Sequence, residues 1–279
     1  MLAVYRMNQG FTLLVIIGLR AGSILVGKEL IKNTELRATI QQIEQYRTAA
    51  HAFKGKYNCF PGDCREAINY GLGVAGGPGD NGDGNGIILG GDPATGVKES
   101  MNFWYHLSQA GTIQGNFPGF LNSTTYTEII AGKDVPKTKL HITSGFWIST
   151  PYALIDEAGN YSFYPLINYF WLFGTIPEVV DNGTFVNNTG ATSPYEMYVI
   201  DKKIDDGLPM TGSINLSLPS FSDFLVIKTT GDLGVLIYGA GGENSPYCAS
   251  TDVNPPIYNT ANVSNNPNTL CVMAIKAIF

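Results

Sequence analysis

Two hydrophobic patterns follow each other along the first part of the chain. Residues 11–27 are apolar at nearly every position, and Arg20 is the one charged residue among them. Residues 28–54 are amphipathic, and their apolar side chains recur at steps of three and four: Leu36, Ile40, Ile43, Tyr46, Ala50 and Phe53. This spacing places them on one face of an α-helix. We therefore predict a helix over residues 11–54, roughly 65 Å long at about 1.5 Å per residue, with Gly55 as its stop.

The two halves of this helix suit different surroundings. The apolar half suits lipid or the core of a filament, whereas the amphipathic half suits packing against a globular domain. A coiled coil is the alternative, but no sustained heptad with flanking charges is present. Residues 11–27 reach the lower limit for a helix that spans a bilayer, and Arg20 near the middle would cost roughly 3 kcal/mol there.

Later segments predict a smaller helix and a sheet. Residues 99–110 have the helical period, with Gly111 as C-cap. Trp104 and His106 in this helix are expected to be packing and surface residues rather than site residues. Beyond residue 140, short aromatic or β-branched runs predict antiparallel strands. These runs are residues 146–148, 162–164, 169–173, 197–200, 225–228 and 235–238. The predicted fold class is α+β, a long helix packed on an antiparallel sheet.

Composition narrows the possible functions. The chain of 279 residues is 44% hydrophobic, enough for a sizeable core. Its net charge is −6, and no cluster of Lys and Arg is present to displace the counterions of phosphates, so nucleic acid is not a predicted partner. There is no G-x-S-x-G elbow, H-E-x-x-H motif or Walker A loop, and no Rossmann fingerprint follows a predicted strand. An enzyme is therefore not predicted, and an exported hydrolase remains only as a third hypothesis.

The four cysteines fall into two groups, Cys59 with Cys64 and Cys248 with Cys271. In an exported protein an even number of cysteines indicates disulfides, although four cysteines permit three pairings. We favour the local pairing, Cys59–Cys64 and Cys248–Cys271, because each group can close a small loop; the second loop spans residues 248–271. Zinc is disfavoured, since the C-x4-C spacing has no second Cys or His pair at zinc-finger distance.

A loop rich in Gly, Asp and Asn, residues 76–92, has the spacing of an EF-hand calcium loop. Its oxygen ligands would be Asn81, Asp83, Asn85, the carbonyl of Ile87 and Asp92, and Glu99 could substitute for Asp92 from the next helix. The first position carries Asn where Asp is usual, and the twelfth carries Asp where a bidentate Glu is usual. The alternative is a solvated cluster of turns. Ca²⁺ is thus the one cofactor that the sequence suggests.

The start of the chain resembles the processing site of type IV prepilins and type II secretion pseudopilins. A short polar leader ends at Gly10, and Phe11-Thr12-Leu13-Leu14 opens the apolar stretch. The resemblance implies that prepilin peptidase removes residues 1–10 and that the new N-terminus at Phe11 is methylated. The alternative is a secretory signal peptide with a small-residue cleavage site, which predicts a mature start near Ser23.

Segments downstream resemble a subset of these proteins that have large heads. Residues 53–63 match F-x-x-K-Y-N-x-x-P-G-D, and the Gly/Asp loop and an E-x-x-x-F-W-x-x-L helix follow in the same order. Residues 201–212 match D-x-K-x-D-D-G-x-P-x-x-G. There we expect Asp201 to cap a helix and residues 205–209 to form a turn, with Ca²⁺ binding as the alternative. The resemblance implies a pilin-like head over residues 55–279.

By this resemblance the chain is a filament subunit. It would insert in the bacterial inner membrane, then join an extracellular or periplasmic filament with copies of itself or other pilin-like subunits. The family usually carries Glu at the fifth mature position, where this chain has Val15. Family members that lack this Glu are mainly minor subunits located at the filament tip. The alternative, which Val15 and Arg20 favour, is a non-polymerising, membrane-anchored or secreted Ca²⁺-binding or adhesive protein.

Overall fold

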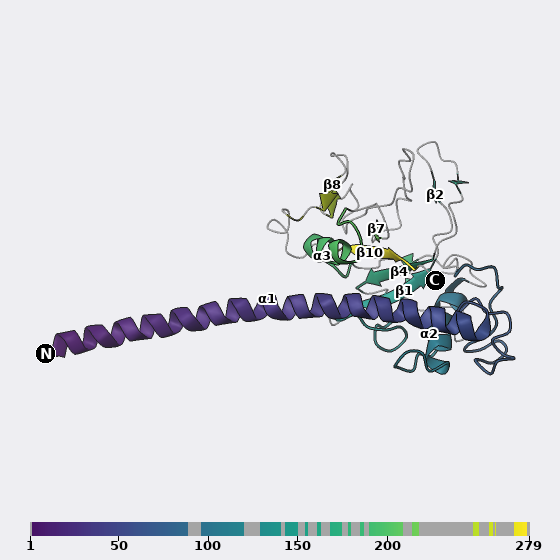
Figure 1. The fold of residues 1–279 in the computed structure, drawn as a ribbon, viewed down its shortest axis with the longest axis horizontal. Coiled ribbons are helices and arrows are strands. Elements are labelled where there is room, and N and C mark those ends of the chain that lie inside the picture. Colours follow the sequence, from purple (N-terminus) through teal and green to yellow (C-terminus); the bar gives the residue numbers. More distant parts are fainter. Residues whose placement is uncertain are drawn as a thin grey trace.

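A long helix with a head around one of its ends makes up the molecule (Figure 1). The structure is a computed structural model, and for residues 2–12 it describes the backbone alone. It describes residues 2–88, 96–119, 129–140, 143–149, 154–155, 161–162, 168–174, 178–179, 185–186, 190–208, 214–217, 248–250, 257–258, 260 and 271–277. The fold is α+β, with a long N-terminal helix and a small antiparallel sheet, as the sequence predicts.

The helix α1 (Leu2–Tyr57) extends past both predicted ends. It includes most of the predicted leader and passes through Gly55, which lies in open space and leaves the helix undisturbed. The helix stops where Asn58 takes a left-handed conformation (φ 56°) and donates its backbone N–H to the carbonyl of Lys54 at 2.8 Å. Asn is the residue after Gly that best tolerates this conformation, so Asn58 is the stop rather than Gly55.

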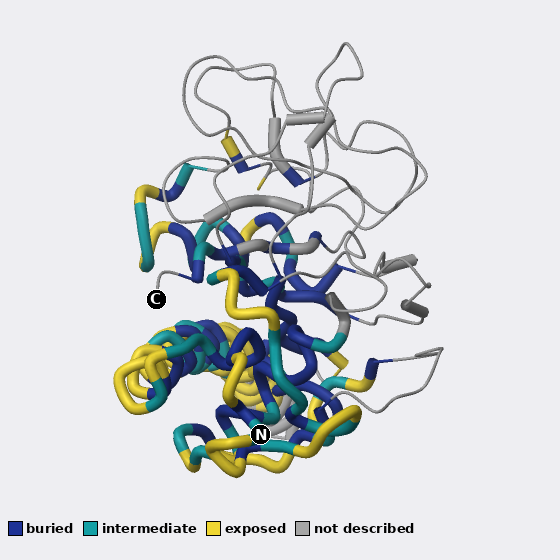
Figure 2. Tube along the Cα trace, turned by 90° about the vertical axis from the view of Figure 1, so that its right-hand side faces the viewer, coloured by how far each residue is buried: buried dark blue, intermediate teal, exposed yellow. Residues whose placement is uncertain are grey.

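The predicted apolar face of α1 is confirmed. Leu36, Ile43, Ala50 and Phe53 are buried, as is Tyr46, and Ile40 packs partly buried against them. Figure 2 shows α1 nearly end-on, with buried positions on the side that faces the head and exposed positions on its outer side. The helix also meets the head through Lys32, whose Nζ lies 3.5 Å from Oε1 of Glu196.

The main sheet has four antiparallel strands in the order β1-β4-β10-β7. They are β1 (Gly145–Ser149), β4 (Tyr169–Phe173), β10 (Val272–Lys276) and β7 (Ile214–Ser217). The sequence predicted β1 and β4 but neither β10 nor β7. Three two-stranded pairs complete the described strands: β2 (Leu154–Ile155) with β3 (Tyr161–Ser162), β5 (Glu178–Val179) with β6 (Phe185–Val186), and β8 (Ala249–Ser250) with β9 (Ile257–Tyr258). The strand predicted at 162–164 overlaps β3 at Ser162, and those at 225–228 and 235–238 lie outside the described residues.

Two further helices are described, of which α2 (Gly96–Gln109) contacts β1 of the sheet and α3 (Pro194–Ile204) contacts α1 and β9. The predicted helix over residues 99–110 is α2; Gly111 follows it at φ 70°, and Thr112 donates to the carbonyl of Leu107, which closes the expected C-cap. The strand predicted at 197–200 is wrong, because these residues belong to α3. Ser193 caps this helix and shares a capping box with Glu196, a start signal that outweighs the β-branched and aromatic side chains.

The core lies between α1, α2 and the sheet, and aromatic rings fill its centre. The ring of Tyr46 meets Trp104 and Phe146 edge to face, with centroids 5.1 and 5.2 Å apart, and Phe170 packs beside Trp104. Such edge contacts add about 0.5–1.5 kcal/mol each beyond the area they bury. This packing fixes the C-terminal half of α1 in the head.

The N-terminal half of α1 lies outside the head and is uncovered (Figure 1). Its large apolar side chains are strongly exposed, from 45% at Val15 to 70% at Leu14. Among the described residues no helix combines the length and the apolar character needed to cross a membrane. The membrane-spanning helix expected over residues 11–27 is therefore not found in that part of the chain.

Candidate functional site

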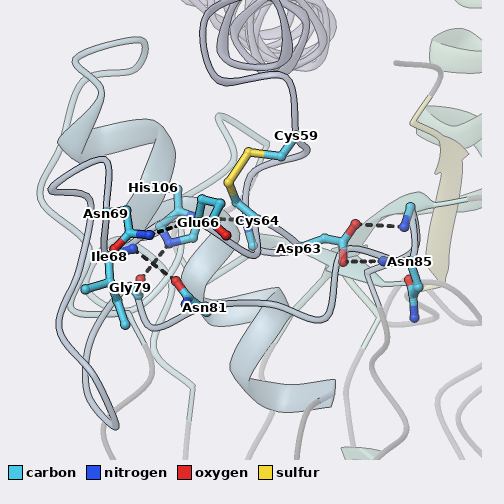
Figure 3. The surroundings of a disulfide bond; sticks show 12 residues. Cys59, Asp63, Cys64, Glu66, Ile68, Asn69, Gly79, Asn81, Asn85 and His106 are labelled. Atoms are coloured by element: carbon cyan, nitrogen blue, oxygen red, sulfur yellow. Dashed lines mark hydrogen bonds between the residues drawn. A yellow bond between two sulfur atoms is a disulfide. The ribbon is translucent and has the colours of Figure 1, made fainter.

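The chain turns sharply after α1, at Pro61-Gly62-Asp63, inside the small loop that the Cys59–Cys64 disulfide closes (Figure 3). Gly62 has φ 84°, and a Cβ there would collide with the backbone carbonyl of Glu99 on α2. Only glycine meets both conditions. The turn thus packs directly on α2, and Asp63 is held at the junction of the two helices and the Gly/Asp loop.

The side chain of His106 joins the parts of this junction through two hydrogen bonds. Its Nδ1 accepts the backbone N–H of Gly62 at 2.9 Å, and its Nε2 lies 3.0 Å from the carbonyl of Gly79, so the ring proton is on Nε2. The ring stacks on Phe53 of α1 with an interplanar angle of 5°. The expected surface position is therefore wrong: His106 is fully buried, and burial lowers its pKa to about 4. The neutral imidazole acts as a structural clamp.

Asp63 is the central carboxylate of the site. Only 2% of the residue is exposed, and its two oxygens accept the consecutive backbone N–H groups of Asn85 (3.0 Å) and Gly86 (2.8 Å) (Figure 3). Burial raises its pKa to about 6, opposed by these hydrogen bonds and reinforced by Asp83. The buried Asp63 thus ties residues 85–86 of the Gly/Asp loop to the turn after α1.

Two more carboxylates join Asp63. Asp83 and Glu99 each place an oxygen so that all three ligand atoms lie within 4.8 Å of one another. Glu99 is buried and accepts the backbone N–H of Asp83 at 3.1 Å. Three carboxylates this close repel one another, and a hard divalent cation that takes oxygen ligands, such as Ca²⁺, would relieve the repulsion.

The predicted calcium ligands are only partly brought together. Asp83 and Glu99 meet at the cluster, whereas the amide oxygen of Asn81 accepts the backbone N–H of Ile68 at 3.0 Å (Figure 3). The amide oxygen of Asn85 accepts the N–H of Ile87 at 2.8 Å. Asp92 lies outside the described residues. Asp63 is a site residue that was not predicted from the sequence, although its place in Pro61-Gly62-Asp63, just before a cysteine, marks a constrained acid.

A second acidic cluster lies at the end of α3. Asp201, Asp205 and Asp206 have ligand atoms within 4.8 Å of one another. Asp201 is buried in the last turn of α3 rather than at a helix start, and it accepts the hydroxyl of Tyr258 at 2.7 Å and the N–H of Gly207 at 3.3 Å. Burial raises its pKa to about 7. The expected turn after residue 204 is present, with Gly207 at φ 79°.

The second disulfide, Cys248–Cys271, joins the start of β8 to the start of β10. Both pairings are the local ones favoured from the sequence. Cys271 also exchanges backbone hydrogen bonds with Thr192, just before α3. The disulfide therefore ties β10 to β8, and the backbone hydrogen bonds of Cys271 hold β10 beside the segment that leads into α3.

Comparisons with known protein families, with curated proteins and with solved structures find no match for this chain.

Proposed function

We propose that this chain is a structural subunit of a type IV pilus-like or type II secretion pseudopilus filament, and not an enzyme. One observation carries the proposal: α1 projects an uncovered apolar segment from a folded head (Figure 1). The prepilin-like motif at Gly10 and Phe11 supports it independently.

The exposed segment needs a partner. Its large apolar residues are Leu13, Leu14, Val15, Ile16, Ile17, Leu19, Ile24, Leu25, Val26, Leu30 and Ile31. A folded monomer rarely exposes a continuous apolar surface of this extent, and each such side chain gains roughly 1.5–3 kcal/mol on full burial. A helix that is apolar nearly all round is stable when other apolar surfaces surround it.

We propose that α1 helices of neighbouring subunits cover this exposed apolar segment. Where α1 packs on the head, a groove of about 410 Å³ lies between α1 and the residue after the α2 C-cap, lined by Gln41, Glu44, Gln45, Thr48, Ala49, Ala52 and Thr112. Short side chains there, such as Ala49 and Ala52, allow a second helix to approach closely. A neighbouring α1 lying along this side would bury apolar surface without changing the head.

The proposal includes a processing step and a location. Prepilin peptidase would cut after Gly10, Phe11 would become the methylated N-terminus, and the subunit would leave the bacterial inner membrane for an extracellular or periplasmic filament. Val15, in place of the usual Glu, points to a minor or tip subunit. Arg20 weighs against the proposal, because a buried Arg20 without a carboxylate partner is costly between apolar helices. Other pilin-like subunits are then partners as well as copies of this chain.

Ca²⁺ is the proposed ligand of the Asp63, Asp83 and Glu99 cluster. This cluster also supports the second candidate function, a non-polymerising Ca²⁺-binding or adhesive protein, which needs the cation but no filament. The two functions differ in the role of α1 and share the same head.

Shearing filaments from the cell surface distinguishes between these two candidate functions. Cells that express the full chain with a pilus assembly machinery are sheared, and the released material is pelleted and examined by immunogold electron microscopy. The proposal expects the chain in filaments, at intervals or at their ends for a minor subunit. Recovery of the chain only as a dispersed monomer would reject the filament function and leave the second candidate.

A further inference from the structure

The Gly/Asp loop holds two Asn-Gly pairs with different surroundings, Asn81-Gly82 and Asn85-Gly86. In such a pair the glycine nitrogen can attack the asparagine side chain and expel ammonia, because glycine has no Cβ to hinder the approach. The reaction needs three groups: a base for the glycine N–H, a donor for the negative charge that develops on Oδ1, and a proton for the leaving nitrogen.

All three groups are in place at Asn85-Gly86. The carboxylate of Asp63 accepts the backbone N–H of Gly86 at 2.8 Å, which positions a base on the nucleophile (Figure 3). The backbone N–H of Ile87 donates to Oδ1 of Asn85 at 2.8 Å, where the oxyanion forms. The leaving nitrogen, Nδ2, donates to Oδ2 of Asp83 at 2.7 Å, and Asp83 can return a proton that it receives from Asp63 through their shared hydrogen bond.

The neighbouring pair lacks the base. The backbone N–H of Gly82 donates to the peptide carbonyl of Cys64 at 3.0 Å, and a neutral carbonyl cannot take its proton. Oδ1 of Asn81 does have a donor, the N–H of Ile68 at 3.0 Å. The two pairs therefore share their sequence, their loop and a donor at Oδ1. They differ in the carboxylate of Asp63 on the glycine nitrogen and in the carboxylate of Asp83 at Nδ2 of Asn85.

We propose that Asn85 is a self-catalysed deamidation site, converted through a cyclic imide with Gly86 to aspartate and isoaspartate. The bond between Gly86 N and Asn85 Cγ forms, and the bond between Cγ and Nδ2 breaks. The Gly86 proton passes to Asp63 and then, through the hydrogen bond that Asp63 shares with Asp83, to Nδ2, which leaves as ammonia. One water then opens the imide at either carbonyl.

The product changes the chemistry of the cluster. Conversion replaces a neutral amide by a carboxylate beside Asp63 and Asp83, and so raises the negative charge of the loop by one. Carboxylates are stronger Ca²⁺ ligands than amides, so the aspartate product would suit a divalent cation better than the encoded asparagine.

Mass spectrometry of the full-length chain tests this inference without any filament. The folded protein is incubated near neutral pH in a chelating buffer, digested, and both Asn-Gly pairs are followed through their +1 Da fragments. We expect Asn85 to convert about tenfold or more faster than Asn81, in line with the contribution of a positioned base. In fully denatured, reduced protein the two rates should converge.

The variant Asp63→Asn isolates the base. It should slow conversion at Asn85 by about tenfold or more and leave Asn81 unchanged. If the variant unfolds, both rates will move to those of the denatured chain, and the ratio in the native wild-type protein decides alone. Equal or slower conversion of Asn85 than Asn81 in the native protein would overturn the inference, as would an unchanged Asn85 rate in a folded Asp63→Asn protein.

Discussion

The Nδ1 atom of His106 accepts the backbone N–H of Gly62 at 2.9 Å. This bond joins α2 to the turn after α1, and the other ring nitrogen joins α2 to the Gly/Asp loop at Gly79. The position of Asp63, one residue after Gly62, depends on it. A single neutral imidazole therefore connects the long helix to the candidate cation site.

Protonation of His106 should weaken the fold in acid. Its pKa is lowered to about 4 in the folded protein and is about 6.5 in the unfolded chain. Its stabilising contribution is therefore complete above pH 6.5 and is lost as the pH falls toward 4, by roughly 3 kcal/mol in total. Denaturant unfolding at pH 7, 5 and 4 measures this change.

Comparing wild type with a His106 variant separates the effect of His106 from the effects of other groups that titrate in the same pH range. Burial raises the pKa values of Asp63 and Asp201, to about 6 and about 7. Protonation of these two acids therefore increases the folding stability as the pH falls, which opposes the effect of His106. We expect the stability difference between wild type and His106→Gln to shrink from pH 7 to pH 4. The exposed His51→Gln variant is the control. A difference independent of pH would contradict the assigned role.

The sequence predicts the buried face of α1 because burial there follows from helical spacing alone. It does not predict Asp63 as a site residue, because Asp63 reaches Asp83 and Glu99 only through the turn at Gly62, a tertiary contact. The apolar run Met197-Tyr198-Val199-Ile200 suits a strand or a helix locally, and the capping box at Ser193 and Glu196 decides for the helix. The prediction that His106 lies at the surface is wrong for a similar reason, since segments distant in sequence bury its side chain.

Calcium should stabilise the head through Asp63. At a Ca²⁺ concentration about 100 times the Kd, binding adds about 2.7 kcal/mol and raises Tm by about 5 °C or more. Asp63→Asn should abolish the rise, while Asp206→Asn in the second cluster should retain it. Thermal melts with EDTA and with millimolar Ca²⁺ make the comparison. An equal rise in wild type and Asp63→Asn would place the cation elsewhere.

The two disulfides should contribute differently. By loop entropy, removal of Cys59–Cys64 with paired Ser substitutions costs about 2 kcal/mol, and removal of Cys248–Cys271, which closes the longer loop, costs about 3 kcal/mol. Only the first disulfide encloses Asp63, so only its loss should reduce the Ca²⁺ effect on Tm. Urea unfolding and calcium melts measure the two effects. Loss of the calcium effect in the Cys248→Ser/Cys271→Ser variant alone would argue against this assignment.

Substitutions in the buried half of α1 should reduce folding stability, whereas substitutions in its exposed half should affect filament assembly. Phe53→Ala removes a fully buried ring and should cost about 3–5 kcal/mol of folding stability. Leu25→Glu alters a side chain that is 66% exposed and should leave stability within about 0.5 kcal/mol. The same change places a charge in the proposed filament core and should remove the chain from sheared filaments. Normal assembly of Leu25→Glu would show that this face is not buried between subunits.

N-terminal mass spectrometry of the chain from membrane and sheared-filament fractions tests the filament role most directly. We predict that the filament fraction contains a peptide that begins at Phe11 and carries a methyl group on its amine, with the uncut chain confined to the membrane fraction. A soluble chain that begins near Ser23, with no peptide beginning at Phe11 in any filament, would contradict it.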